Sequence, residues 1–175
     1  MLKYCQIINS STGLVSIGEG TNTDFYESIG MVERDVEQSD VDNQWYLTEK
    51  CPHKSEEEKL KEAKQAKIEE NDTKRDNALI RGVEYREVLF DSDTDQKVNL
   101  LGKISEMGDE DVITWFGMDN VPLECTKQDL ACIGGLIIQL HTFCWNHNAE
   151  IKNKIAKAKT VKQVEAIEIN YEGVN

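Results

Sequence analysis

The segment "HTFCWNH", residues 141–147, contains the side chains of this sequence that are best suited to chemistry. His141, Cys144 and His147 are residue types that bind Zn²⁺. The surrounding pattern predicts a helix, in which each residue turns by about 100°, so the two histidines lie roughly 120° apart on opposite sides of Cys144. Three ligands on one straight helix cannot converge on a single ion from these directions. We therefore predict no metal site here and interpret Cys144 as a small buried apolar residue.

Other patterns that could support catalysis or ligand binding are incomplete. Cys144 and a neighbouring histidine could form a nucleophile–base pair, but no third orienting group accompanies them. The segment "GEGTN", residues 18–22, lacks the spacing of a phosphate-binding loop. The alternating acids of "DSDTDQ" resemble the start of a calcium loop, but the required glycine and the final glutamate are missing, so we expect these residues to cap a helix. The sequence thus predicts no enzyme activity, no metal and no cofactor.

The charge of the chain limits its partners. The 175 residues include 20 Lys and Arg against 33 Asp and Glu, a net charge of −13, which disfavours nucleic acid and anionic lipid as partners. No apolar stretch reaches the roughly 18 residues that cross a bilayer, and the N-terminal segment lacks the pattern of a secretory signal. Five irregularly spaced cysteines favour free thiols in a reducing cytoplasm. We expect no nucleic-acid partner, no membrane partner and synthesis inside a cell.

The distribution of aromatic residues divides the chain into three regions. Residues 1–53 contain five aromatic residues, residues 54–80 contain none, and residues 81–175 contain the other seven. This predicts an α+β protein with a β-rich docking unit at 1–53, a helical spacer at 54–80 and an α+β unit of hairpins and amphipathic helices at 81–175.

The first region is predicted to form short strands. "YCQIIN" and "LVSIG" flank the turn-forming "SSTG", which indicates a hairpin, and "QWYLTEK" is predicted to be a third strand that ends before Pro52. So few large side chains make a thin core, and such a unit gains stability from a partner. The side chains expected to contact that partner are Phe25, Tyr26, Trp45, Tyr46 and Leu47.

The middle region is predicted to be a long, highly charged helix. Ser55 and Glu58 have the spacing of a capping box, and Glu70 and Lys74 form a favourable pair four residues apart. Apolar residues are few and follow no heptad, so a solvated spacer is expected. A weakly self-associating stalk, and with it a homo-oligomer, is the alternative.

The third region is predicted to contain two hairpins, at 83–90 and around Asp119-Asn120. Between them a helix is expected to begin at Ser92 or Asp93, to end near Gly108, and to place Val98, Leu101, Ile104 and Met107 on its apolar face.

A long helix is predicted to follow from a Thr126 cap to about Lys159, and a short helix from a Thr160 cap. Gly134-Gly135 within the long helix permits either the close approach of another helix or a kink. The apolar stripe of the long helix contains Leu130, Ile133, Ile137, Leu140, Cys144, Ile151 and Ile155.

Residues from about Asn77 to Ile169 resemble a small domain of unknown function that recurs in bacteriophage tail proteins and prophages. The resemblance rests on Gly82-x-x-Tyr85, on "FDSDTDQKVNLLGK", on "ITWFGMDNVPLECT" and on "NHNAEIKNKIAKAKTVKQVEAI". The N-terminal "TGLVSIGEGTN…FYESIGM…QWYL" resembles the start of short phage tail and tail-fibre-associated proteins.

This resemblance implies a role in the virion rather than an enzyme activity. It implies a structural component of the tail, baseplate or fibre attachment, made in the bacterial cytoplasm and acting through contacts with other virion proteins. A tail-fibre assembly chaperone that leaves before the particle matures is the alternative.

Overall fold

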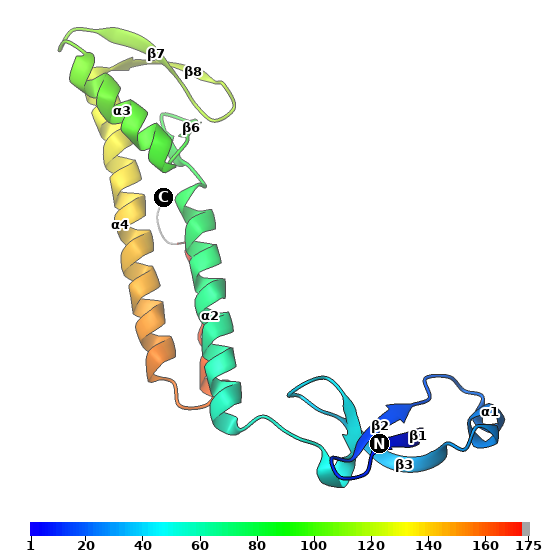
Figure 1. Ribbon diagram of the computed structural model, residues 1–175. Helices are drawn as coiled ribbons and strands as arrows, with labels where there is room; N and C mark the ends of the chain where they lie inside the picture. The colour runs from blue at the N-terminus through cyan, green and yellow to red at the C-terminus, as the bar shows by residue number, and fades with distance from the viewer. Residues whose placement is uncertain (173–175) are drawn as a thin grey trace. The chain divides into compact units, whose positions relative to one another are not determined.

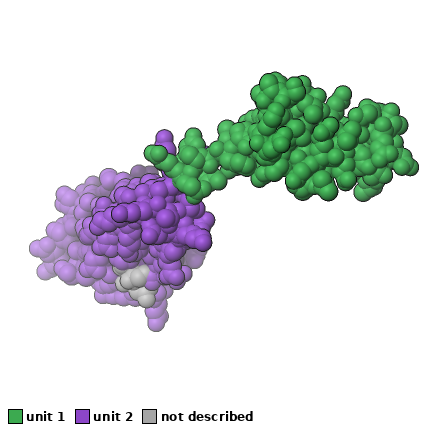
Figure 2. Space-filling view, turned by 90° about the horizontal axis from the view of Figure 1, so that it is seen from below, with its two compact units in different colours: residues 1–59 green, residues 60–175 purple. Residues whose placement is uncertain are grey.

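A computed structural model describes residues 1–172 of the chain (Figure 1). It contains both helices and strands, which confirms the predicted α+β class. The chain divides into two compact units, Met1–Lys59 and Leu60–Asn175, which Figure 2 colours separately. Among the described residues, no helix combines the length and the apolar character that crossing a bilayer requires.

The first unit is a small closed barrel of four antiparallel strands in the order β1-β2-β4-β3. The strands are β1 (Leu2–Asn9), β2 (Leu14–Ile17), β3 (Val32–Gln38) and β4 (Trp45–Leu47), with a helix α1 (Thr23–Ser28) and a 3-10 turn η1 (Thr48–Lys50). The predicted hairpin, β1 with β2, and the predicted third strand, β4, are confirmed. Strand β3 was not expected from the sequence, because its segment "VERDVEQ" is mostly charged.

The core of the first unit is thin, as expected. Its buried apolar residues are Cys5, Val15 and Val36, and Ile17, Trp45 and Leu47 pack partly against them. These side chains come from alternate positions of the four strands, since successive residues of a strand point to opposite faces.

The second unit is built on two antiparallel helices, α2 (Glu56–Leu79) and α4 (Lys127–Lys157). Lys64 Nζ donates to the carbonyl oxygen of Ala156 at 2.9 Å, and Asn71 Nδ2 donates to that of Asn148 at 3.2 Å. The later residue of α2 thus contacts the earlier residue of α4, so the two helices lie side by side and run in opposite directions (Figure 1).

The prediction of a solvated spacer at 54–80 is therefore wrong, and the boundary between the units lies at Lys59 instead. The helix itself was predicted correctly: Ser55 and Glu58 exchange hydrogen bonds as a capping box, and Lys74 pairs with Glu70 at 2.8 Å. Its packing was missed because its two buried residues are Asn71 and Ala78, a polar and a small residue.

The remaining elements complete the second unit. They are β5 (Val83–Tyr85) paired with β6 (Val88–Phe90), α3 (Thr94–Glu106), β7 (Val112–Phe116) paired with β8 (Pro122–Thr126), and α5 (Val161–Glu165). Among them, β5, α3 and β8 contact α4. Both predicted hairpins are confirmed, as are the helix caps at Asp93, Thr126 and Thr160. The first hairpin lacks a turn signal because Arg86 and Glu87, with φ of 50° and 64°, occupy positions that usually favour Gly or Asn.

The predicted apolar face of α3 is partly wrong. Leu100 and Met107 are buried, whereas Val98 is 62 % exposed and Leu101 is 50 % exposed. Leu100 faces α4 at Gly134, where an added Cβ would lie 3.2 Å from Leu100 Cδ2. Of the two alternatives for the glycine pair, the structure thus shows a close approach between helices.

The apolar stripe of α4 is confirmed, since all seven predicted residues are buried. Its first half packs on α3 and the two hairpins, in a cluster that includes Phe90, Leu100 and Cys125. Its second half packs on α2 and the C-terminal segment, in a cluster that includes Ala78, Ile169 and Tyr171.

Candidate functional site

The three predicted docking residues on β4 mainly serve the fold of the first unit. Trp45 and Leu47 are half-buried against its core, and Lys3 Nζ lies 4.3 Å above the centre of the Trp45 ring. Tyr46 is only 9 % exposed, and its hydroxyl donates to Asp42 Oδ2 at 2.8 Å. In the folded unit Tyr46 is therefore unavailable to a partner, contrary to the expectation.

The other two predicted docking residues lie on α1. Tyr26 is half-buried: its ring stacks on Tyr4 with centroids 6.0 Å apart, and its hydroxyl accepts a hydrogen bond from Gly20 N at 2.6 Å. Phe25 packs edge-on against Tyr26 at 5.7 Å but remains 53 % exposed.

An apolar residue that the sequence did not single out directly follows α1. Ile29 is the C-cap of α1, is 50 % exposed and follows Phe25 by four residues, about one helical turn. We call Phe25 and Ile29 the α1 patch. Asn22 caps this helix through Phe25 N, and Tyr26 anchors it to β1, so the patch is held on a fixed support.

The three chemically suggestive residues of "HTFCWNH" each have a different structural partner. His141 Nε2 lies 2.7 Å from the carbonyl oxygen of Ser92, and Cys144 is fully buried, as predicted. His147 stacks on Phe143, with centroids 5.4 Å apart, and meets the edge of Tyr171 at 5.0 Å. Burial raises the pKa of the Cys144 thiol, which disfavours a reactive thiolate there.

A buried polar cluster between α2, α4 and the C-terminal segment was not expected from the sequence. Tyr171 donates to Asn71 Oδ1 at 2.8 Å, and Asn148 Nδ2 donates to Asp72 Oδ1 at 2.9 Å. Burial alone would raise the pKa of Asp72, but Lys152, at 2.7 Å, and Asn148 hold it below its usual value. The polar groups of this cluster bind one another, which indicates a structural role.

A second polar cluster joins the first hairpin to the start of α4. Asp129 accepts hydrogen bonds from Thr126 N at 2.9 Å and from the Tyr85 hydroxyl at 2.8 Å, and it pairs with Arg86 at 2.6 Å. The hydrogen bonds from Thr126 and then Tyr85 lower the pKa of Asp129 to about 2. This carboxylate is the N3 member of the capping box of α4 and also holds the hairpin.

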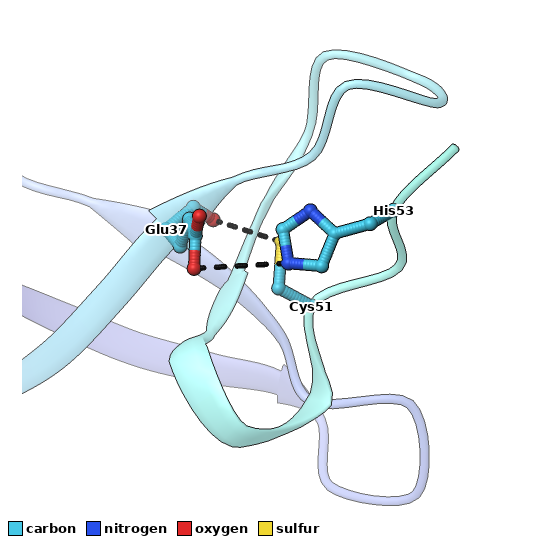
Figure 3. A group of neighbouring side chains, drawn as sticks. All are labelled: Glu37, Cys51 and His53. Atoms are coloured by element: carbon cyan, nitrogen blue, oxygen red, sulfur yellow. Dashed lines mark hydrogen bonds and ion pairs between the residues drawn. The ribbon is translucent and has the colours of Figure 1, made fainter. Parts of the chain in front are cut away.

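One group of side chains of metal-ligating types was not recognised from the sequence. Glu37, Cys51 and His53 place their ligand atoms within 4.8 Å of one another (Figure 3). The local signal was Cys51-Pro52-His53, two ligand types separated by one residue, and Glu37 joins them only through the pairing of β3 in the barrel.

Comparisons with known proteins identify the domain of the second unit. Neither the curated proteins nor the solved structures contain a match to this sequence. The family described as "Domain of unknown function (DUF4376)" matches residues 62–171, which is more than half of the chain. The match confirms the resemblance to a domain of unknown function and includes most of α2, in agreement with the packing of that helix. The chain belongs to the DUF4376 family.

Proposed function

We propose that this protein is a structural component of a bacteriophage particle, in the tail, the baseplate or the fibre attachment. It acts through contacts with other virion proteins. Two features support the proposal: the resemblance of residues 77–169 to a domain found in phage tail proteins, and the two compact units of the chain.

The observation that carries the proposal is the α1 patch. An exposed phenylalanine on a helix that is anchored by a cap and a ring stack, with an exposed isoleucine at the end of that helix, resembles the aromatic anchors that dominate binding energy in protein interfaces. The thin core of the first unit adds a reason for contact, because burial of this patch against a partner would enlarge its apolar core.

The contact can be tested with the full-length chain, tagged and expressed in phage-producing cells. We expect the wild-type chain to capture a protein that mass spectrometry also finds in finished particles. Phe25→Ser should reduce that capture at least tenfold, because it removes the apolar anchor without disturbing a buried side chain. Val41→Ser is the matched control, since Val41 is 54 % exposed in the same unit but lies outside α1.

Equal capture by the wild-type chain and the Phe25→Ser variant would contradict the role of the α1 patch. Capture of an isolated fibre protein from infected cells, with no trace of the chain in finished particles, would instead favour the assembly chaperone.

A further inference from the structure

We propose that Glu37, Cys51 and His53 form a binding site for a zinc ion, which would hold the chain that leaves the barrel against strand β3. The inference is independent of the proposed role in the virion. Figure 3 shows the three side chains turned toward one another, with Glu37 on β3 and the other two on the segment after η1.

The three ligand atoms lie within 4.8 Å of one another, and one pair is already close to the spacing of a tetrahedral site. His53 Nε2 lies 3.8 Å from Glu37 Oε2. Zinc bonds of about 2.0–2.3 Å place neighbouring donor atoms about 3.3–3.6 Å apart. A bound zinc ion would therefore shorten the distance between His53 Nε2 and Glu37 Oε2 by only a few tenths of an ångström.

The backbone that carries Cys51 and His53 is fixed in place on both sides of Pro52. The buried Ser39 hydroxyl donates to the carbonyl oxygen of Pro52 at 2.8 Å, and Lys54 N donates to Asp40 Oδ1 at 2.7 Å. Cys51 is extended, with φ −65° and ψ 122°, so residues 51 and 53 project to the same side. The site is thus largely preformed before an ion binds.

The donor atoms select zinc over the harder cations. Thiolate and imidazole ligands favour zinc, whereas calcium and magnesium prefer sites made of oxygen atoms. On binding, the Cys51 S–H bond breaks, the proton passes to solvent, and the thiolate sulfur bonds to the metal. The carboxylate of Glu37 and the nitrogen lone pair of His53 supply the other two bonds.

A neighbouring carboxylate would orient the histidine. His53 Nδ1 lies 3.8 Å from Asp40 Oδ1, on the side of the ring opposite the ligand nitrogen Nε2. This arrangement resembles the carboxylate–histidine–zinc pattern, in which the outer carboxylate fixes the tautomer and the ring direction. Lys59 Nζ, 3.3 Å from Asp40 Oδ2, holds that carboxylate from its other side.

The site has an entry path and a structural purpose. The side chains of His53 and Glu37 are 47 % and 45 % exposed, which leaves solvent access and room for a water as fourth ligand. Small domains with few buried apolar residues often gain stability from a bound metal, and the core cluster of the first unit has only three such residues. Zinc would therefore stabilise the barrel.

Zinc titration of the full-length chain tests the proposal. The protein is prepared without a metal-affinity tag, reduced with a phosphine that does not chelate metal, and titrated with zinc chloride by calorimetry. We expect one ion per chain and a rise in the thermal midpoint of the first unit, followed through Trp45 in a variant that lacks Trp115 and Trp145. Cobalt bound at the same site should show the charge-transfer absorption of a metal–thiolate bond.

Substitutions separate this site from adventitious binding. Cys51→Ser and His53→Gln should each weaken zinc binding at least tenfold, and Asp40→Asn should weaken it about tenfold through the lost orientation of His53. Cys132→Ser is the matched control, because Cys132 is another partly exposed free thiol and should leave the affinity unchanged. Equal zinc affinity in the wild-type, Cys51→Ser and His53→Gln chains, or a cobalt complex without the thiolate band, would overturn the proposal and indicate an adventitious ion only.

Discussion

Asn71 fixes the packing between the two long helices and the C-terminal segment through one buried amide. Its side chain donates to the backbone of α4 and accepts a hydrogen bond from Tyr171, with no exposed surface. Asn71→Ala should lower the free energy of unfolding of the second unit by about 1–3 kcal/mol, because two buried polar groups lose their partner. Urea denaturation followed through Trp115 measures the change.

The control for this substitution is Asn153→Ala, at an exposed position of α4. A loss of stability as large for Asn153→Ala as for Asn71→Ala would contradict the importance of the buried amide.

Asp129 makes the stability of the second unit depend on pH in acid. Its pKa falls from the ordinary 3.8 to about 2 on folding, through hydrogen bonds from Thr126 and Tyr85. A lowered pKa in the folded state means that the contribution is complete above about pH 4 and is lost as the pH falls through 2. Asp129→Asn should therefore be less stable at neutral pH and should show a flatter decline of unfolding free energy between about pH 4 and pH 2.

The measurement is a series of denaturant titrations over this pH range, with exposed Asp109→Asn as the matched control. Parallel declines for the wild-type and Asp129→Asn chains would show that another carboxylate controls the acid response.

Single residues were predictable from the sequence where a hydrophobic period located them. Cys144 was expected to be buried because it lies in the middle of an apolar stripe, and it is. Asn71 and His53 were not recognised, because their roles depend on polar contacts with residues distant in the sequence. Periodicity contains no information about such contacts.

At the scale of elements, α4 organises both apolar clusters of the second unit. Two adjacent isoleucines test this role: Ile137 is 1 % exposed and Ile138 is 47 % exposed. Ile137→Ala should destabilise the second unit by about 2–5 kcal/mol, since it leaves a cavity, whereas Ile138→Ala should change stability by about 0.5 kcal/mol or less. Urea denaturation of both variants measures the difference, and similar losses would contradict the assigned orientation of α4.

Helices α2 and α3 show that the sequence of a helix predicts its ends better than its buried face. The Ser55 and Asp93 caps located both helices correctly. The buried faces of both helices were predicted wrongly. Helix α2 packs through Asn71 and Ala78, which are not large apolar residues. In α3 the apolar residues were expected at three-residue steps, and each such step turns by about 60° around the helix, so these residues do not share one face. The close approach at Gly134 selects Leu100 instead of Leu101.

At the scale of the whole molecule, the two units differ in the size of their cores. The first unit buries three apolar residues in its cluster, while the second has two larger clusters. We therefore expect the first unit to unfold at lower urea concentration in metal-free protein. Tryptophan fluorescence follows each unit separately. In a variant with Trp115 and Trp145 replaced by Phe, Trp45 reports on the first unit alone, and in the Trp45→Phe variant the other two tryptophans report on the second unit. Coincident transitions for the two reporters would contradict separate cores.

The proposed virion role is tested most directly by quantitative mass spectrometry of density-purified phage particles. We expect this chain in a fixed number of copies per particle, at the same ratio to the major tail proteins across independent preparations. Particles that lack the chain, from a lysate in which it is abundant, would contradict its role as a structural component.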